Sequence, residues 1–331
     1  MGSTYATADD LAARAAYRAA SGTTYAHTAA TRAAAPADRK IHESLDPKRL
    51  NTLGVKVREC LDSPEHPLTI PVVVAFDETG SMGQGPIVIQ QKLASLKGLT
   101  LRSGLIDAQL CFGAYGDAEC YEVAPCQIGQ FESGLEMEEW LNNLYLEGLG
   151  GGNGGETAGL LMYFLANYSK LDSLDKRGKK GYLFLTGDET SLPVTKKMVL
   201  DYIGEGIEAD LSMEEVVRQC SESYEIFFFL VMNGAARTQG SLNFWTKLLG
   251  QDHVVQVENL DNIAELTAAL LAAEEGVVLT PDMMKAEGVA GTSIEVVNKT
   301  LANYAGGTKA TVAVATSGTV AGAATTAADR L

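Results

Sequence analysis

Residues 226–231 read Ile-Phe-Phe-Phe-Leu-Val and are apolar at every position. Successive side chains of a strand point to opposite faces of a sheet, so a strand of this composition needs both faces covered. Strands buried on both faces belong to parallel sheets that carry helices on each side. This run therefore predicts an α/β domain.

Strand-like and helix-like segments alternate along the chain from residue 70 to residue 275. Short apolar runs predict strands at residues 70–76, 109–115, 181–186, 224–232 and 254–257. Amphipathic stretches between them predict helices at residues 87–101, 135–146, 157–168, 194–203, 212–220, 242–249 and 263–273. The alternation predicts a doubly wound α/β fold, with a mostly parallel sheet and helices on both faces.

The segments that flank this domain differ from it in composition. Residues 1–40 are rich in Ala, Thr and Arg and cannot build a core of their own, so they predict an arm that is loose or becomes helical on docking. Residues 41–69 carry scattered aliphatic side chains and predict a lead-in packed on the domain. Residues 276–331 form an extension rich in small residues, in which the alternation at residues 311–316 hints at a strand.

The charge of the chain limits its partners. It carries 42 acidic residues against 26 Lys and Arg residues, a formal net charge of −16. This balance argues against non-specific binding to nucleic acid and against adhesion to anionic membranes. It suits a surface that meets cations or basic partners, and ordinary solubility also explains it.

Neither the start of the chain nor its apolar runs predict export or membrane insertion. The first residues lack a basic segment followed by an apolar one, and no stretch reaches the roughly 18 apolar residues of a membrane span. The five cysteines form no CxxC pair, which predicts reduced thiols in the cytoplasm. A disulfide between Cys120 and Cys126 across a short hairpin is the alternative.

The strand predicted at residues 70–76 runs directly into Asp77, Thr79 and Ser81. Their alternation places one carboxylate and two hydroxyls on the same side of an extended loop, and Gly80 lets the backbone curl around an ion. Hard divalent cations prefer oxygen ligands of this kind. A strand-ending turn followed by a helix cap would explain the same residues.

Two later segments favour the metal interpretation. Residues 150–155 read Gly-Gly-Gly-Asn-Gly-Gly and lead into a predicted helix with Thr157 at its start. The strand predicted at residues 181–186 is followed closely by Asp188. In doubly wound folds ligands bind at the carboxyl ends of strands, where Asp77 and Asp188 both lie.

The order of these segments resembles a von Willebrand factor type A domain with its metal-ion-dependent adhesion site, over roughly residues 68–275, and we assign the domain to residues 70–275. The resemblance implies that the hydroxyls of Thr79 and Ser81 contact Mg²⁺ directly. Asp77, Thr157 and Asp188 would contact the ion directly or through water. Mn²⁺ and Ca²⁺ accept the same oxygen ligands. One coordination position is left for an Asp or Glu of a partner protein.

The sequence departs from the family pattern in two places. Thr79 stands where the family usually has Ser, which keeps the hydroxyl. The third loop reads Thr-Gly-Asp at residues 186–188 instead of Thr-Asp-Gly, so either Asp188 or Glu189 faces the ion, and we favour Asp188. Residues 112–119, 125–132 and 179–184 also resemble a subgroup of bacterial and phage-encoded type A proteins.

Other chemistries find less support in the sequence. The glycine loop lacks the Gly-Lys-Thr/Ser ending of a nucleotide-binding loop, and the four histidines share no zinc-ligand spacing. Glu78 and Glu189 are the near candidates for the general base that a metal-dependent hydrolase needs. Asp117, at the end of a predicted strand, either supports the metal ligands or caps backbone amides in a turn.

We therefore expect a metal-dependent protein-interaction module without enzymatic activity, located in the cytoplasm. The resemblance implies an adaptor in a larger assembly, with an AAA+ ATPase as one class of partner. The alternative is a phage-derived structural protein that self-assembles through its terminal arms, in which case it would lie in a virion. A metal-dependent hydrolase is a third hypothesis.

Overall fold

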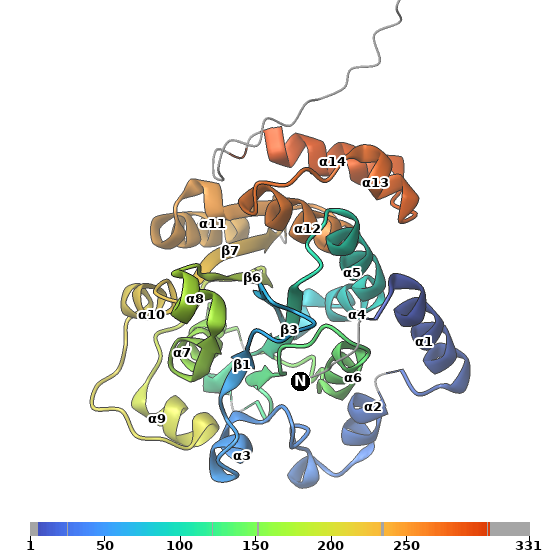
Figure 1. The fold of residues 1–331 in the computed structure, drawn as a ribbon. Helices are drawn as coiled ribbons and strands as arrows, with labels where there is room; N and C mark the ends of the chain where they lie inside the picture. Colours follow the sequence, from blue (N-terminus) through green and yellow to red (C-terminus); the bar gives the residue numbers. More distant parts are fainter. Residues whose placement is uncertain are drawn as a thin grey trace, which may run out of the picture.

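The computed structural model describes residues 6–24, 26–120, 122–150, 152–232, 235–302 and 304. At its centre lies a six-stranded sheet with the strand order β4-β3-β2-β6-β7-β8 (Figure 1). The strands are β2 (Ile70–Asp77), β3 (Ala108–Tyr115), β4 (Cys126–Ile128), β6 (Gly181–Gly187), β7 (Tyr224–Val231) and β8 (Val254–Val257). Every neighbouring pair is parallel except β3 and β4. The prediction of a doubly wound, mostly parallel α/β fold is confirmed.

Alternate residues of each central strand enter two separate cores, because successive side chains point to opposite faces. In β2, Val72, Val74 and Phe76 join one core, while Val73 and Ala75 join the other. Figure 1 shows α7 and α10 on one side of the strands and α4 and α5 on the other. Neither face of the sheet is left to solvent, which explains why the run at residues 226–231 has no polar position.

The helices of the domain are α4 (Gly85–Gln91), α5 (Leu93–Arg102), α6 (Glu136–Asn143), α7 (Ala158–Tyr168), α8 (Asp172–Arg177), α9 (Lys196–Met198), α10 (Met213–Cys220), α11 (Ala235–Leu249) and α12 (Ile263–Glu274). A π-helical turn, Val199–Ile203, continues α9. Short 3-10 turns lie at Pro36–Asp38, Gly80–Met82, Ala118–Cys120, Gln251–His253 and Leu260–Asn262. The helix expected at residues 87–101 is divided between α4 and α5 at Lys92, whose ψ is −4°.

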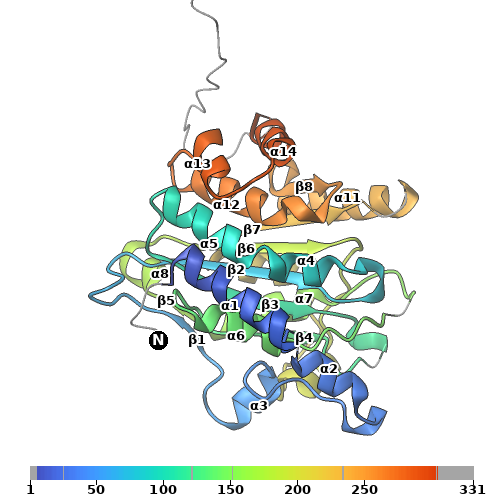
Figure 2. The same ribbon diagram turned by 90° about the vertical axis from the view of Figure 1, so that its right-hand side faces the viewer.

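Segments before the domain pack on it. Helix α1 (Ala8–Ser21) contacts α5, and α2 (Ala26–Ala33) contacts α6. Figure 2 shows α1, in dark blue, lying over the face of the domain that carries α5. Helix α3 (Pro47–Thr52) follows, and β1 (Arg58–Cys60) pairs in parallel with β5 (Ser169–Leu171) as a separate two-stranded sheet.

Segments after the domain include two helices that the sequence analysis did not predict. Helices α13 (Pro281–Ala286) and α14 (Gly291–Ala302) contact α5 and α12. Ile294 and Val297 of α14 are buried in the core on this side. The strand expected at residues 311–316 lies outside the described residues.

All five cysteines lie in the described part of the chain and are free thiols, so Cys120 and Cys126 are not joined. Among the helices that the structure describes, none is both long and apolar enough to cross a membrane.

Lys97 of α5 is fully buried, and its Nζ donates a hydrogen bond to the carbonyl of Ala108 at 3.2 Å. Burial lowers the pKa of Lys97 to about 8, and nearby Asp107 opposes this shift. Between this value and the unfolded value of about 10.4, the unfolded chain binds a proton that the folded chain does not, so stability rises with pH. Relative to a Lys97→Met variant, the free energy of unfolding should rise by about 2 kcal/mol between about pH 7.5 and about pH 9.5.

Urea denaturation of both proteins across this range measures the difference, because other titrating groups are common to both. A difference that does not change with pH would show that Lys97 stays charged in the folded protein.

Candidate metal centre

The first loop of the site is held by one carboxylate oxygen of Asp77, the last residue of β2. The backbone amide and the hydroxyl of Thr79 both donate to Asp77 Oδ1, at 2.7 Å and 2.6 Å. The amide of Glu78 donates to the carbonyl of Tyr115 at 2.9 Å, which continues the pairing of β2 with β3. A 3-10 turn, Gly80–Met82, then begins. The loop is therefore shaped by the Asp77 carboxylate and by strand pairing, and not by a helix cap on Thr79, whose side chain makes no capping bond.

Ser81 links this loop to the end of the neighbouring strand β6. Its hydroxyl oxygen lies 3.1 Å from that of Thr79 and donates to Asp188 Oδ1 at 2.9 Å. Asp77, Thr79, Ser81 and Asp188 thus form one connected chain of polar side chains. Since hydroxyl protons point toward the two carboxylates, lone pairs of the hydroxyl oxygens are left for a cation.

Asp188, which we favoured of the two acids in the third loop, contacts Ser81 through its carboxylate. Asp188 is 1% exposed, while Glu189 is half-buried and accepts the indole N–H of Trp245 on its backbone carbonyl at 2.9 Å. Gly187 has a steric role just before them: a Cβ there would lie 2.6 Å from the hydroxyl of Tyr115 and 3.5 Å from Cβ of Asp77. A glycine at this position lets the ends of β6, β2 and β3 approach one another.

Thr157 lies at the start of α7 and is tied to the end of β3. Its hydroxyl donates to the carbonyl of Gly116 at 2.7 Å and accepts the amide of Ala118 at 3.2 Å. Its backbone amide also donates to Gly116, at 2.8 Å. The structure thus brings four of the five predicted ligands into one run of polar contacts and ties Thr157 to the segment after β3.

Asp117 follows Gly116 and is fully buried. Its Oδ1 accepts the amide of Glu119 at 2.9 Å, so the turn-capping interpretation of this residue describes one of its oxygens. Its Oδ2 is buried and has no hydrogen-bond partner among the described residues.

Sequence reasoning missed Glu156, the residue immediately before Thr157. Its side chain is 7% exposed, and its Oε2 has no hydrogen-bond partner among the described residues. Burial, followed by the charges of Asp77 and Asp117, raises the pKa of Glu156 to about 9. An isolated Glu after a glycine loop has no distinctive pattern, and only the convergence of strand ends places it near Asp77.

Asp77, like Glu156, has a buried carboxylate oxygen, its Oδ2, without a hydrogen-bond partner in the described part of the chain. Burial raises the pKa of Asp77 well above its ordinary value, the two bonds from Thr79 lower it, and the charges of Asp188 and Glu122 raise it. Buried carboxylate oxygens without partners are costly, and a bound cation would satisfy them. Carboxylates together with hydroxyls fit a hard divalent ion such as Mg²⁺.

No protein-family model matches this chain, and no curated protein matches it. Several solved structures are similar to it at low identity. The pilus adhesin SpaC of Lactobacillus rhamnosus GG aligns with 66% of this chain and 30% of its own, at 12% identity and a TM-score of 0.42. Proximal thread matrix protein 1 of the mussel byssus aligns with 62% of this chain and 48% of its own, at 9% identity and a TM-score of 0.41.

The vWF domain of the pilus tip protein Mfa5 of Porphyromonas gingivalis aligns with 62% of this chain and 94% of its own, at 9% identity and a TM-score of 0.41. This chain therefore spans about a third of the adhesin and about half of the byssus protein. The doubly wound fold is established by the strand order itself.

Cation binding should strengthen as pH rises. Burial and neighbouring acids raise the pKa of Asp77 well above its ordinary value and that of the nearby Glu156 to about 9, so protons compete with a cation at this end of the sheet. A bound cation favours the ionised form of Asp77, its ligand, and of Glu156 close by, so binding releases any protons that these carboxyls hold. The apparent affinity for Mg²⁺ should therefore increase by up to about tenfold per pH unit for each proton released, between about pH 6 and about pH 9.

Titration calorimetry in buffers of different ionisation enthalpy measures both the affinity and the protons released. An affinity that is constant over this range, with no proton release, would contradict the prediction.

Replacing Asp77 with asparagine should separate the cost of the buried carboxyl from its benefit to the cation. The amide oxygen of the new side chain can still accept from Thr79, so we expect Asp77→Asn to unfold at the same temperature as wild type, or higher, in EDTA. The wild type should gain about 2.7 kcal/mol when Mg²⁺ exceeds its Kd about a hundredfold, and the variant should lose this gain.

Differential scanning calorimetry with and without Mg²⁺ provides the comparison. Asp252→Asn, which removes an exposed carboxylate, is the matched control and should respond as wild type does. A full Mg²⁺ response in Asp77→Asn would remove Asp77 from the site.

Proposed function

We propose that this chain is a metal-dependent protein-interaction module without catalytic activity of its own. In this proposal Mg²⁺ is held by Asp77, Thr79, Ser81 and Asp188, with Thr157 contributing directly or through water. When bound, the ion supplies an electrophilic position that accepts an Asp or Glu carboxylate of a partner protein. Mn²⁺ or Ca²⁺ could take the place of Mg²⁺, since both accept oxygen ligands.

The observation that carries the proposal is the difference in solvent exposure among the connected side chains of the site. Asp77, Thr79 and Asp188 are 0%, 3% and 1% exposed, whereas Ser81 is exposed. A cation bound to these side chains would have acidic groups beneath it and would reach solvent on the side of Ser81. That geometry leaves room for a ligand from outside, and a partner carboxylate needs the cation to offset the negative charge below.

The hydrolase hypothesis receives less support from the described residues. Glu78, one of the two candidate bases, is 2% exposed, and its Oε2 accepts the backbone amide of Glu147. One oxygen of its carboxylate is therefore held by the loop that carries Glu147. The backbone of Glu189 is likewise tied to Trp245, although its side chain is half-buried near the third loop.

The self-assembly hypothesis relied on terminal arms that dock on neighbouring subunits. Helices α1 and α2 instead contact their own domain, and the hydroxyl of Thr28 donates to the carbonyl of Leu144 at 2.8 Å. We therefore retain the adaptor role in a larger assembly, with an AAA+ ATPase as one partner class, as part of the proposal. The partner class comes from the sequence resemblance, and the cytoplasmic location from the cysteine pattern.

Affinity capture with the tagged full chain tests the module. A partner should bind wild type in Mg²⁺, and its recovery should fall at least about tenfold, or about 1.4 kcal/mol, in EDTA and with Ser81→Ala. Ser293→Ala on α14 removes a hydroxyl far along the sequence and should bind as wild type does. Replacing the partner's contacting Asp or Glu should cause the same loss as EDTA.

Circular dichroism of each variant shows that the fold is retained. Equal recovery of the same partner with Ser81→Ala, or in EDTA, would overturn the proposed function.

A further inference from the structure

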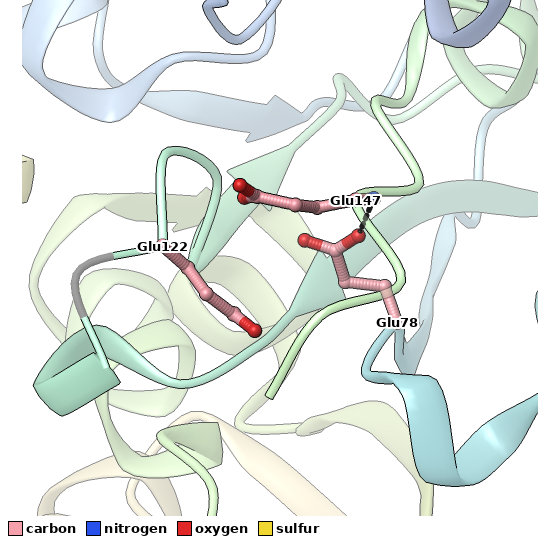
Figure 3. A group of neighbouring side chains, drawn as sticks. All are labelled: Glu78, Glu122 and Glu147. Carbon is pink, nitrogen blue, oxygen red and sulfur yellow. Dashed lines mark hydrogen bonds between the residues drawn. The ribbon is translucent and has the colours of Figure 1, made fainter. Parts of the chain in front are cut away.

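Three glutamates from separate loops meet beneath the first loop of the candidate metal centre. Glu78 follows β2, Glu122 follows the 3-10 turn Ala118–Cys120, and Glu147 lies in the loop after α6 (Figure 3). One carboxylate oxygen of each lies within 4.8 Å of the others. None of the three belongs to the predicted set of ligands around Asp77.

These carboxylates are buried together without an ionic partner. Glu78, Glu122 and Glu147 are 2%, 3% and 8% exposed. Among the described residues, no cationic side chain acts on Glu78 or Glu122, and Arg39 is the one whose charge acts on Glu147. Three acidic groups brought out of water into contact need a compensating charge or bound protons.

Backbone amides fix one oxygen of each carboxylate. Oε2 of Glu78 accepts the amide of Glu147, and Oε2 of Glu122 accepts the amide of Asp117. Oε2 of Glu147 accepts the amides of Val123 and Ala124, at 2.9 Å and 3.2 Å. The three side chains are therefore positioned by the loops that they join, before any ligand binds.

Two further carboxylate oxygens of the cluster are buried without hydrogen-bond partners in the described part of the chain. They are Oε1 of Glu78 and Oε1 of Glu122. Figure 3 shows that the free oxygen of Glu78 points into the space between Glu122 and Glu147, away from the hydrogen bond to the backbone of Glu147. A buried carboxylate oxygen that lacks a hydrogen-bond partner and faces other carboxylates needs compensation. A bound cation with oxygen ligands would supply it.

Gly116 leaves the space that this arrangement needs. A Cβ at Gly116 would lie 2.0 Å from Oε2 of Glu122 and 3.4 Å from Oε1 of Glu78. Any side chain at this position would displace Glu122. The absence of a side chain here is thus a steric condition for the cluster, independent of the charges.

We propose that Glu78, Glu122 and Glu147 form a second cation site, which binds Ca²⁺. Oxygen ligands of Ca²⁺ lie at about 2.3–2.6 Å from the ion, so they stand at most about 5 Å apart, and the observed spacing falls within this limit. Mg²⁺ usually keeps several waters, for which a cluster this deeply buried has little room. Ca²⁺ accepts carboxylates in flexible geometry and suits the site better.

The second site shares its backbone with the first but uses different side chains. Asp77 and Glu78 are consecutive at the end of β2, and their carboxylates bind separate partners, Thr79 for one and Glu147 for the other. The loop that carries Glu147 continues to Leu149, whose carbonyl accepts the amide of Gly80 at 2.5 Å. Bound Ca²⁺ would therefore hold the loop that supports Thr79 and Ser81.

Equilibrium dialysis of the chelator-stripped full chain against Ca²⁺ tests the proposal. Ser81→Ala, which weakens the first centre, should retain a bound Ca²⁺, and the double variant Glu122→Gln, Glu147→Gln should lose one bound Ca²⁺ per chain relative to wild type. Glu119→Gln, at an exposed acid in the same segment, is the matched control and should bind as wild type does. Gly116→Ala should weaken Ca²⁺ binding by at least about tenfold because it displaces Glu122.

A second measurement is the unfolding temperature with and without Ca²⁺. A rise with Ca²⁺ in Ser81→Ala that disappears when Glu122→Gln is added would support the site. Glutamine keeps the shape of glutamate, and the single variant replaces the double one if the latter does not fold. Equal Ca²⁺ binding by Glu122→Gln and wild type would overturn the proposal, as would glutamine variants that gain stability while wild type binds no Ca²⁺. Neither outcome depends on partner capture, so this inference can fail while the proposed function stands.

Discussion

Buried negative charge at the carboxyl ends of β2, β3 and β6 is the constraint on which the rest of the site depends. The parallel register places Asp77 beside Tyr115 of β3, and Phe76, one residue earlier, beside Thr186 of β6. The segments that leave these strands carry acids that are almost fully buried. In a low-dielectric interior such groups repel one another and lose hydration, so they are tolerated only when hydrogen bonds, protons or cations compensate them.

The fold supplies the first part of this compensation through short-range backbone contacts. Amide groups of Thr79, Glu119 and Glu147 each donate to a buried carboxylate. Gly187 lets the strand ends approach, and Gly116 leaves room for the side chain of Glu122. What the backbone leaves unsatisfied is a set of carboxylate oxygens on both sides of the end of β2. The two proposed cation sites follow from those oxygens, one toward solvent at Ser81 and one in the interior at Glu122.

Much of the fold was predictable because its strands lie within a buried parallel sheet. Such strands must be apolar along their whole length, and the run at residues 226–231 identified β7 without any tertiary information. Strand β4 was missed because Cys126–Ile128 is too short to show a period, and it pairs only through contact with β3. Helix α14 was missed because its sequence is rich in small residues, and its burial depends on the surface of α12.

The candidate site likewise contains residues that local sequence could predict and residues that only tertiary contacts bring together. Asp77, Thr79 and Ser81 are close in sequence, so local alternation was enough to predict that they share a loop. Their role as metal ligands stays a prediction, as does that of Thr157. Glu122, Glu147 and Glu156 had no local signal, since each is a single acid in an ordinary loop, and nothing local joined Glu78 to Glu122 and Glu147.

The sequence by itself determined the α/β class and the loop chemistry after β2, because apolar periodicity and short-range hydrogen bonding act over a few residues. Only the tertiary structure decided which acids are buried together and which oxygens lack partners. Glu78 and Glu147 are separated by 69 positions and meet through one backbone amide. Electrostatic cost depends on distance and burial, and neither is defined until the strands have been ordered in the sheet.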